Sequence, residues 1–334
     1  MGTVAVALIS IMAMGTGSAQ GGDRDAAPAT ETIRVVPEST RSGGADAFLP
    51  ELPGAVRELT RIQQRIAAHV TAGETAHTFA SYLDRTTGRI VLKSDAPSEV
   101  VIAVTGRRAT APLTTPLPAP AAAPFQDPGI NAPHRYQDNA PFSGGAAIRT
   151  ATTPPCTSGL AVKVSTGQVY LTTSASCFPH NGPVQTEVGA TPLGTAFHRV
   201  PQVDTVVIGG RTYGGRIYVG GLVTSSTIPV ASAGAATVGP VEHCYSGRTS
   251  GEVCANKVVS LNGQLCGPRE CTYGLIVTRG GSPPQPGDQG APFYFKDAAG
   301  AHVRGQVYVA VGAECFVTSW TRISTALGVS IVTG

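Results

Sequence analysis

The pattern of apolar and polar residues near the N-terminus predicts a helix followed by strands. Between residues 53 and 72, apolar residues recur every three or four positions, as they do on the buried face of a helix. They are Val56, Leu59, Ile62, Ile66 and Val70. Two β-branched runs follow at residues 89–93 and 100–104, and we expect both to be strands. Together these segments predict a small α+β unit in which the helix packs on a sheet.

From residue 135 onward, the pattern changes to short β-branched runs separated by glycine and proline. Many short strands at such spacing are typical of an all-β barrel or sandwich. Helical periodicity returns only at the very end of the chain. The predicted strands include residues 162–164, 169–172, 203–208, 216–219, 257–261, 274–278 and 302–311.

Composition divides the chain further. An apolar run at residues 4–14 is too short to span a membrane, and the small residues Gly17, Ser18 and Ala19 after it are typical of a signal-peptide cleavage site. Residues 106–127 are rich in proline and alanine without periodicity, as in a semi-extended linker. The predicted division is a signal peptide (1–19), a disordered segment (20–45), a small domain (46–105), a linker (106–134) and a β-domain (135–334).

Charge and cysteine content narrow the function classes. The 334 residues carry a formal net charge of +3 and 13% charged residues, too little positive charge to favour a nucleic acid or an acidic membrane as partner. All seven cysteines lie in the C-terminal half, and none has zinc-finger spacing. We therefore expect a disulfide framework, an oxidising compartment, and neither a metal nor another cofactor.

One loop carries the most specific chemical signal. Residues 287–292 read Gly-Asp-Gln-Gly-Ala-Pro, which resembles the Gly-Asp-Ser-Gly-Gly-Pro loop of chymotrypsin-like serine proteases. Upstream, residues 171–177 read Leu-Thr-Thr-Ser-Ala-Ser-Cys, similar to the family's Thr-Ala-x-His-Cys, and Asp204 opens an apolar run as the family's aspartate does. Further likeness lies at residues 140–146, 156–162 and 244–251.

The order of these motifs resembles the streptogrisin and α-lytic branch of the trypsin superfamily over residues 135–334. The resemblance implies a chymotrypsin-like double β-barrel. Residues 79–84 and 87–91 are also similar to the pro-segment of such proteases, so the small domain at 46–105 is interpreted as pro-segment-like.

The residues at the implied catalytic positions are unsuited to acyl transfer. Such a site needs a serine hydroxyl, an imidazole that takes its proton, and a carboxylate that orients the imidazole. Ser176 stands at the histidine position and Gln289 at the serine position, and only Asp204 is retained. A glutamine amide has no acidic O–H for a base to remove, and a serine hydroxyl is not a useful base near neutral pH. The other histidines considered, His180, His198 and His243, are not expected to replace the missing base.

Parts of a binding site are nevertheless implied by the resemblance. The backbone N–H groups of Gly287 and Gln289 would form the oxyanion hole, and residues 307–312, with Val309, Ala310 and Val311, would form the edge strand that pairs with a peptide. The competing interpretation is that Gln289 itself fills the hole. Because a buried carboxylate needs a partner, we also expect the Ser176 hydroxyl or a water molecule to donate to Asp204.

The resemblance also suggests how the cysteines pair. It implies the disulfides Cys156–Cys177 and Cys244–Cys254. Among the remaining three cysteines, it favours a partner for Cys315 near the active-site loops, with Cys266–Cys271 as the competing pair.

These features predict a secreted protease homologue without peptidase activity. It would act as a binding or decoy module for an extended peptide or protein ligand. Two alternatives remain open at this stage. One is an active secreted endopeptidase with atypical site residues, and the other is a wall or matrix protein in which the fold is only a scaffold.

Overall fold

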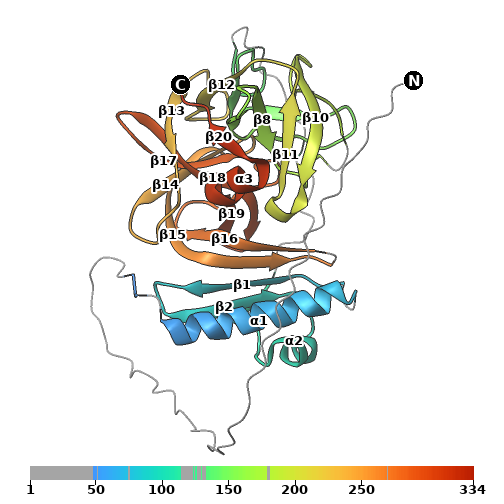
Figure 1. Ribbon diagram of the computed structural model, residues 1–334, viewed down its shortest axis with the longest axis vertical. Helices are drawn as coiled ribbons and strands as arrows, with labels where there is room; N and C mark the ends of the chain where they lie inside the picture. The colour runs from blue at the N-terminus through green and yellow to red at the C-terminus, as the bar shows by residue number, and fades with distance from the viewer. Residues whose placement is uncertain are drawn as a thin grey trace, which may run out of the picture. The chain divides into compact units, whose positions relative to one another are not determined.

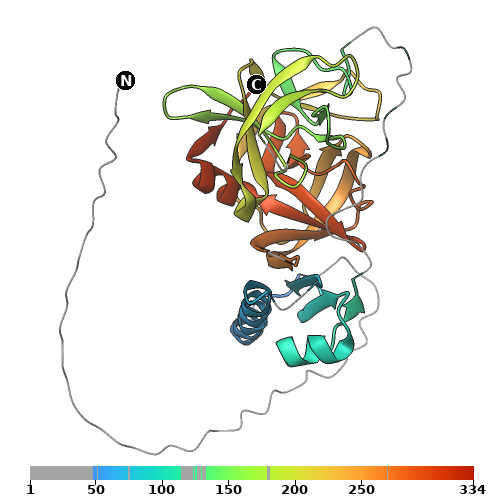
Figure 2. The ribbon, with the colours of Figure 1, turned by 90° about the vertical axis from the view of Figure 1, so that its right-hand side faces the viewer.

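A computed structural model of the chain describes residues 48–50, 52–73, 76–113, 123, 125, 129, 133–178, 181–268 and 270–334 (Figures 1 and 2). The predicted signal peptide (1–19) and polar segment (20–45) lie outside the described residues, as does much of the predicted linker (106–134). None of the described helices combines the length and the apolar character that a membrane crossing requires.

The predicted N-terminal helix is present as α1 (Pro53–Thr71). Its apolar stripe is buried and packs with Phe79 and Leu92 of the hairpin formed by β1 (Phe79–Asp84) and β2 (Arg89–Ser94). The short strand β3 (Ala111–Pro112) lies further along the chain and extends this sheet by pairing with β2 in parallel. The helix-on-sheet arrangement inferred from the periodicity is therefore confirmed.

The strand predicted at residues 100–104 is wrong, because this segment is part of a helix, α2 (Ser98–Thr105). Val101 and Thr105 are the buried positions, one helical turn apart, and the helix ends at Gly106 with a φ of 76°. A run of β-branched residues shows a strand-like composition, but packing on α1 decides its conformation. Helix α2 thus covers the small unit beside α1.

The hairpin of the small unit continues directly into the β-domain. Strand β1 pairs antiparallel with β15 (Gly251–Cys266), in a register that sets Phe79 opposite Cys266 and Ser81 opposite Gln264. Backbone hydrogen bonding therefore runs from β3 through β1 into the larger sheet without interruption.

The larger sheet contains a closed barrel within the described residues. Its strands pair in the ring β14–β15–β16–β19–β18–β17 and back to β14, so the strand order closes on itself. Strands β4, β12 and β13 continue the sheet from β18. The bounds are β4 (Phe142–Gly144), β12 (Tyr213–Tyr218), β13 (Thr227–Ala233), β14 (Glu242–Gly247), β16 (Cys271–Arg279), β17 (Pro292–Asp297), β18 (Gly300–Val311) and β19 (Glu314–Ser319).

The second sheet has the order β20–β7–β8–β11–β10–β9–β5–β6. Its inner face buries a core that includes Ile148, Leu171, Phe178 and Leu193. The predicted all-β architecture with two β-barrel halves is confirmed by these pairings. The bounds are β5 (Ala147–Arg149), β6 (Cys156–Thr157), β7 (Ala161–Val164), β8 (Val169–Thr173), β9 (Gly182–Thr186), β10 (Pro192–Val200), β11 (Thr205–Gly209) and β20 (Val329–Ile331), with the turn η1 (Pro201–Val203) and the helix α3 (Trp320–Leu327).

Disulfides close three loops among the described residues. The predicted pairs Cys156–Cys177 and Cys244–Cys254 are present. The third bond joins Cys266 to Cys271, so the favoured partner for Cys315 was wrong and the competing pair is correct. The β15–β16 register sets Cys266 directly opposite Cys271, whereas Cys315 is a free thiol buried in the core of the closed barrel.

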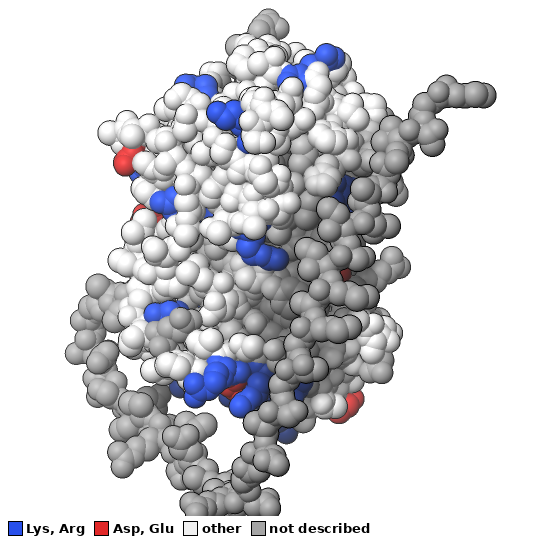
Figure 3. Space-filling view, in the orientation of Figure 1, with Lys and Arg blue, Asp and Glu red and all other residues white. Residues whose placement is uncertain are grey.

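Charged side chains are sparse on the face of the molecule shown in Figure 3; basic ones are scattered over this face, and one cluster of them lies near the end that holds the small unit. This distribution agrees with the low charged content of the sequence. On this face, no basic stripe follows the barrels.

Candidate functional site

Asp204, the aspartate singled out in the sequence, lies directly after the turn η1 and before β11. Asp204 is 5% exposed and has a φ of 43°, a left-handed conformation that aspartate adopts more readily than most residues. Its carbonyl oxygen accepts a hydrogen bond from the N–H of Ala175 at 3.2 Å. The chain reversal at η1 therefore fixes the carboxyl group against the turn that follows β8.

Two groups donate hydrogen bonds to the Asp204 carboxylate. The Ser174 hydroxyl donates to Oδ2 at 2.6 Å, and the backbone N–H of Ser176 donates to Oδ1 at 2.8 Å. The Ser176 hydroxyl instead lies 2.6 Å from Ser174 Oγ. The expected direct bond from the Ser176 hydroxyl is thus replaced by one from Ser174, a residue that sequence reasoning missed.

These contacts form a chain of hydroxyl groups from the interior to the surface. Ser174 is fully buried, whereas Ser176 is exposed. Because the Ser174 proton is directed to Asp204, Ser174 Oγ accepts from Ser176. Burial raises the pKa of Asp204 to about 7, against the opposing effect of its hydrogen bonds from Ser174 and Ser176. The signal for Ser174 in the sequence was its position two residues before Ser176.

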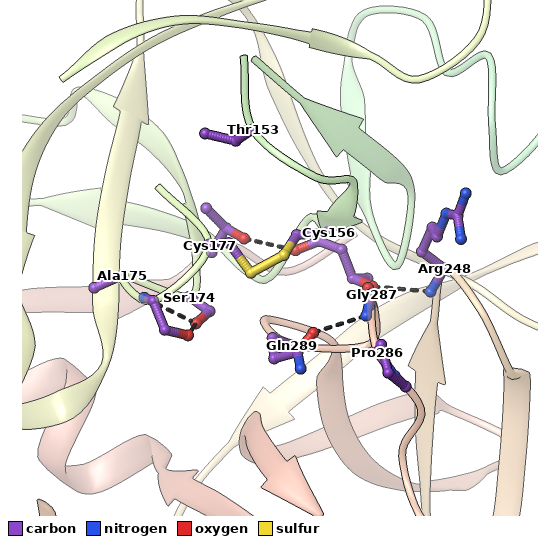
Figure 4. The surroundings of a disulfide bond; sticks show 12 residues. Thr153, Cys156, Ser174, Ala175, Cys177, Arg248, Pro286, Gly287 and Gln289 are labelled. Carbon is purple, nitrogen blue, oxygen red and sulfur yellow. Dashed lines mark hydrogen bonds between the residues drawn. A yellow bond between two sulfur atoms is a disulfide. The ribbon is translucent and has the colours of Figure 1, made fainter. Parts of the chain in front are cut away.

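The loop at residues 287–290 is closed by the side chain of Gln289. The N–H of Gly287 donates to Oε1 of Gln289 at 2.8 Å, and Gln289 is only 9% exposed. Figure 4 shows the Gln289 side chain turned back toward Gly287, with the Cys156–Cys177 disulfide nearby. An N–H group predicted to serve a substrate carbonyl is therefore bound within the protein.

Strand β6 ties this loop to the Ser174 turn. The Thr157 N–H donates to the carbonyl oxygen of Gln289 at 3.1 Å. The Thr157 hydroxyl donates to the carbonyl oxygen of Gly287 at 2.7 Å. A Cβ atom on Gly290 would lie 2.9 Å from the backbone nitrogen of Ser174, so the two segments touch. The structure thus brings positions 174, 176, 204 and the 287–290 loop to one seam between the sheets.

Asp288 holds the loop from the other side. It is fully buried and accepts hydrogen bonds from the backbone N–H groups of Thr249, Ser250 and Gln285 and from the Ser250 hydroxyl. Burial nevertheless raises its pKa. Asp288 therefore positions the loop and is not directed into the seam.

The predicted groove edge continues directly from this loop. The N–H of Gly290 donates to the carbonyl oxygen of Val307 at 2.9 Å, and the N–H of Val307 donates to that of Ala291 at 2.8 Å. Beyond Gln306, described strand pairing exists only on the β19 side, where it extends to Val311. The segment with Val309, Ala310 and Val311 therefore has one edge without a strand partner in the described part of the chain.

The two ends of this β18 edge have different neighbours. Near the seam, burial raises the pKa of Tyr308, and the nearby charge of Asp204 acts in the same direction. At the other end, Lys93 Nζ of the small unit donates to the carbonyl oxygen of Val311 at 3.3 Å. The small unit therefore reaches the far end of the groove edge.

None of the described histidines completes a triad. His243 is buried in β14, stacked on Phe293 at 5.0 Å between ring centroids, and burial lowers its pKa. His198 is exposed on β10, and His180 lies outside the described residues. Cys244, Glu252 and Cys254 lie within metal-ligand distance, but their two sulfur atoms are joined in a disulfide.

Comparison with known proteins relates this architecture to bacterial serine proteases. No family model matches the chain, and no curated protein matches it. Among solved structures, it is similar to a glutamic acid-specific serine protease that uses a histidine triad in substrate binding, with 19% identity, a TM-score of 0.47 and coverage of 57% of this chain and 100% of that one. It is also similar to Nocardiopsis protease NAPase and to Thermobifida fusca protease A, at 20% and 21% identity, each with a TM-score of 0.47 and coverage of 57% of this chain and 98% of theirs. These are likenesses of fold.

Proposed function

We propose that this chain is a secreted serine-protease homologue that does not hydrolyse peptides and that binds an extended peptide or protein segment along its groove edge. The observation that carries the proposal is the hydrogen bond from the Gly287 N–H to the Gln289 side chain. It fills the position where a substrate carbonyl would be polarised.

Three requirements of acyl transfer are unmet in this arrangement. Gln289 has no hydroxyl, Ser176 supplies no imidazole, and Asp204 is bound to Ser174 and to the Ser176 backbone. Loss of a nucleophile or base reduces turnover by roughly 10⁶-fold in a well-studied protease. Here both are replaced, so hydrolysis is not expected.

Peptide binding is supported by the open edge of β18. An extended peptide that adds to a sheet edge gains main-chain hydrogen bonds without needing a nucleophile or an oxyanion hole. Because the 308–311 edge starts beside the Gln289 loop, a bound peptide would pass the seam while its carbonyl groups pair with β18.

Secretion is supported by the apolar run at residues 4–14, the small residues after it, and the three disulfides. Disulfides form and persist in oxidising compartments.

A peptide-binding assay tests the function directly. Purified protein is titrated against a fluorescent library of extended peptides, and hits are remeasured by fluorescence anisotropy with Ala310→Arg and with Thr325→Arg as the control. Ala310 is half-buried on the edge, and Thr325 is exposed on α3, so the two variants add the same charge at different places. We expect about 10-fold weaker binding for Ala310→Arg alone, a loss of about 1.4 kcal/mol. Absence of any peptide hit would favour the scaffold alternative.

A second candidate, an active endopeptidase with atypical residues, is favoured by one observation. The exposed Ser176 hydroxyl is linked through Ser174 to a carboxyl group with a pKa of about 7. A fluorophosphonate probe separates the two functions, because it labels only an activated serine. Labelling that disappears in Ser176→Ala would establish the second candidate and overturn the first.

A further inference from the structure

A second set of contacts, outside the groove edge, holds part of the linker on the β-domain. Glu187 and Arg248 form an ion pair whose side chains are only 4% and 5% exposed, with Arg248 Nε donating to Glu187 Oε2 at 2.6 Å. Tyr136, which is 1% exposed, donates its hydroxyl to the carbonyl oxygen of Arg248 at 2.6 Å. The arginine side chain also lies 5.7 Å from the tyrosine ring centroid.

These three side chains contact two linker residues through two hydrogen bonds to the backbone and one stacked pair of rings. Arg248 Nη2 donates to the carbonyl oxygen of Ala123 at 2.6 Å, and Glu187 Oε1 accepts from the N–H of Phe125 at 2.8 Å. The Phe125 ring stacks on Tyr136, with 3.5 Å between centroids and an interplanar angle of 10°. In the sequence, residue 124 is a proline, which has no N–H to offer between the bound Ala123 carbonyl and the bound Phe125 N–H.

The residues of the β-domain in this cluster are more deeply buried than the two linker residues that they contact. The ion pair and the tyrosine belong to the buried body of the domain, whereas Ala123 is exposed and Phe125 is half-buried. A buried charge pair is costly unless its remaining donors and acceptors are bound, and here the linker backbone binds them. The contacts involve one main-chain carbonyl group, one main-chain N–H and one aromatic ring, so another segment with an aromatic residue two positions after the bound carbonyl group can make the same contacts.

We propose that Tyr136, Glu187 and Arg248 form a peptide clamp that binds extended segments of the type residue–proline–aromatic, and that the chain's own Ala123 and Phe125 occupy it as a displaceable ligand. Tethering gives the linker a high effective concentration, so an external peptide competes poorly until that segment is weakened.

The clamp adjoins the candidate site without being part of it. The N–H of Arg248 donates to the Thr157 hydroxyl at 2.8 Å, and that hydroxyl donates to the carbonyl oxygen of Gly287. Figure 4 shows the Arg248 side chain directed away from Gln289. The proposal is therefore independent of peptide binding along β18, and each can fail without the other.

The test uses the full chain and the hexapeptide Ala-Ala-Pro-Phe-Gln-Asp, the sequence of residues 122–127, with a fluorescein at its N-terminus. Anisotropy titrations compare the wild type with Phe125→Ala, which removes the tethered ring. We expect saturable binding to Phe125→Ala and at least about 10-fold weaker binding to the wild type.

Changes in the peptide test the contacts without any risk to folding. Replacing its phenylalanine by alanine, or methylating the phenylalanine nitrogen, should each weaken binding to Phe125→Ala at least about 10-fold. Methylation of the glutamine nitrogen is the matched control and should have little effect. Glu187→Gln on the Phe125→Ala background should also weaken binding, with circular dichroism as a check on folding. Absence of saturable binding, or equal binding of the phenylalanine, alanine and N-methyl peptides, would overturn the clamp.

Discussion

At the scale of single residues, Asp204 shows how a buried carboxyl group is held by a serine hydroxyl and a backbone N–H. A hydroxyl and a backbone N–H now bind the two oxygens, so the carboxyl group keeps partners although it remains fully enclosed. These neutral donors do not offset the cost of burying the charge, and the pKa of Asp204 therefore rises to about 7. The group titrates close to neutral pH.

This titration predicts how stability depends on pH. Because the pKa of Asp204 is higher in the folded than in the unfolded chain, the folded state binds more protons between about pH 4 and pH 7. Its contribution to the free energy of unfolding is complete below about pH 4 and falls by about 1.4 kcal/mol per pH unit up to about pH 7. In urea unfolding from pH 4 to pH 8, the free energy of unfolding should fall more steeply, by this amount, in the wild type than in Asp204→Asn, because Asp138, whose pKa burial raises to about 6, contributes equally to both proteins.

The matched control is Asp297→Asn. Its hydrogen bond to His302 lowers the pKa of this exposed carboxyl group, so its removal should leave the negative slope in place. A parallel pH dependence of the wild type and Asp204→Asn would contradict the assignment of the raised pKa.

If positions 176 and 289 correspond to a protease's histidine and serine, as proposed, changing both residues should produce peptidase activity. Ser176→His and Gln289→Ser together would restore a base and a nucleophile beside the retained carboxylate and release the Gly287 N–H from the glutamine. We expect fluorophosphonate labelling and slow peptide hydrolysis only in the double variant, since each single variant still lacks one group. Adding Asp204→Asn should reduce the gain. A folded double variant that is neither labelled nor active would mean that these positions do not form a working triad.

At the scale of elements, the small unit shows where local composition and packing disagree. The helix α2 contains a run of β-branched residues, yet it ends with a left-handed glycine and packs through Val101 and Thr105. Helix α1 has no such conflict, because its periodicity and its propensity agree. Helix α1, in which hydrophobic periodicity and helix propensity agree, was predicted from the sequence, whereas α2, in which they conflict, was not.

Two glycine substitutions test the role of these helix ends. Gly106 has a φ of 76°, and an added Cβ would lie 3.2 Å from Arg65 Nη1, so Gly106→Ala should destabilise the protein by about 1 kcal/mol. Gly54 lies in the first turn of α1 with nothing within 4 Å of an added Cβ, so Gly54→Ala should be neutral or stabilising by about 0.5 kcal/mol. Urea unfolding measures both. Equal effects of the two substitutions would argue against the left-handed helix end.

At the scale of the whole molecule, buried charges join the small unit to the closed barrel. Glu314 of β19 is paired with Lys93 and Arg279, and it accepts a hydrogen bond from the Tyr82 hydroxyl at 2.9 Å. Arg279 of β16 also pairs with Asp84 at 3.0 Å. Although burial opposes it, the hydrogen bond and charge of Lys93 hold the pKa of Glu314 below its ordinary value.

Neutralising Glu314 should loosen this junction. Breaking a buried pair typically costs about 3–5 kcal/mol, so Glu314→Gln should be strongly destabilised at pH 7 and should be cleaved faster within the small unit during limited proteolysis. The difference should shrink as the pH falls below about 4, because the lowered pKa contributes stability only while the wild-type carboxylate is ionised.

The control removes an exposed ion pair instead. Arg61 and Glu58 of α1 are 67% and 42% exposed, so Arg61→Gln should change the free energy of unfolding by about 0.5 kcal/mol or less. If Glu314→Gln were as mild as this control, the small unit would not depend on the buried charges.

The sequence by itself determined the folding class and the side chains present at each position. Side-chain identity excludes an imidazole at position 176 and a hydroxyl group at position 289 wherever they lie, and the alternation of short β-branched runs is a local property of the chain. The Cys156–Cys177 and Cys244–Cys254 bonds were also anticipated, through the resemblance stated above.

Only the tertiary structure decided what occupies the vacated site. The direction of the Gln289 amide, the buried Ser174 hydroxyl on Asp204, and the register that pairs Cys266 with Cys271 depend on segments far apart in the chain. The same holds for the linker contacts of Phe125 with Glu187 and Tyr136. Sequence patterns report local periodicity and residue chemistry, whereas these contacts arise when packing sets the distance and orientation between distant groups.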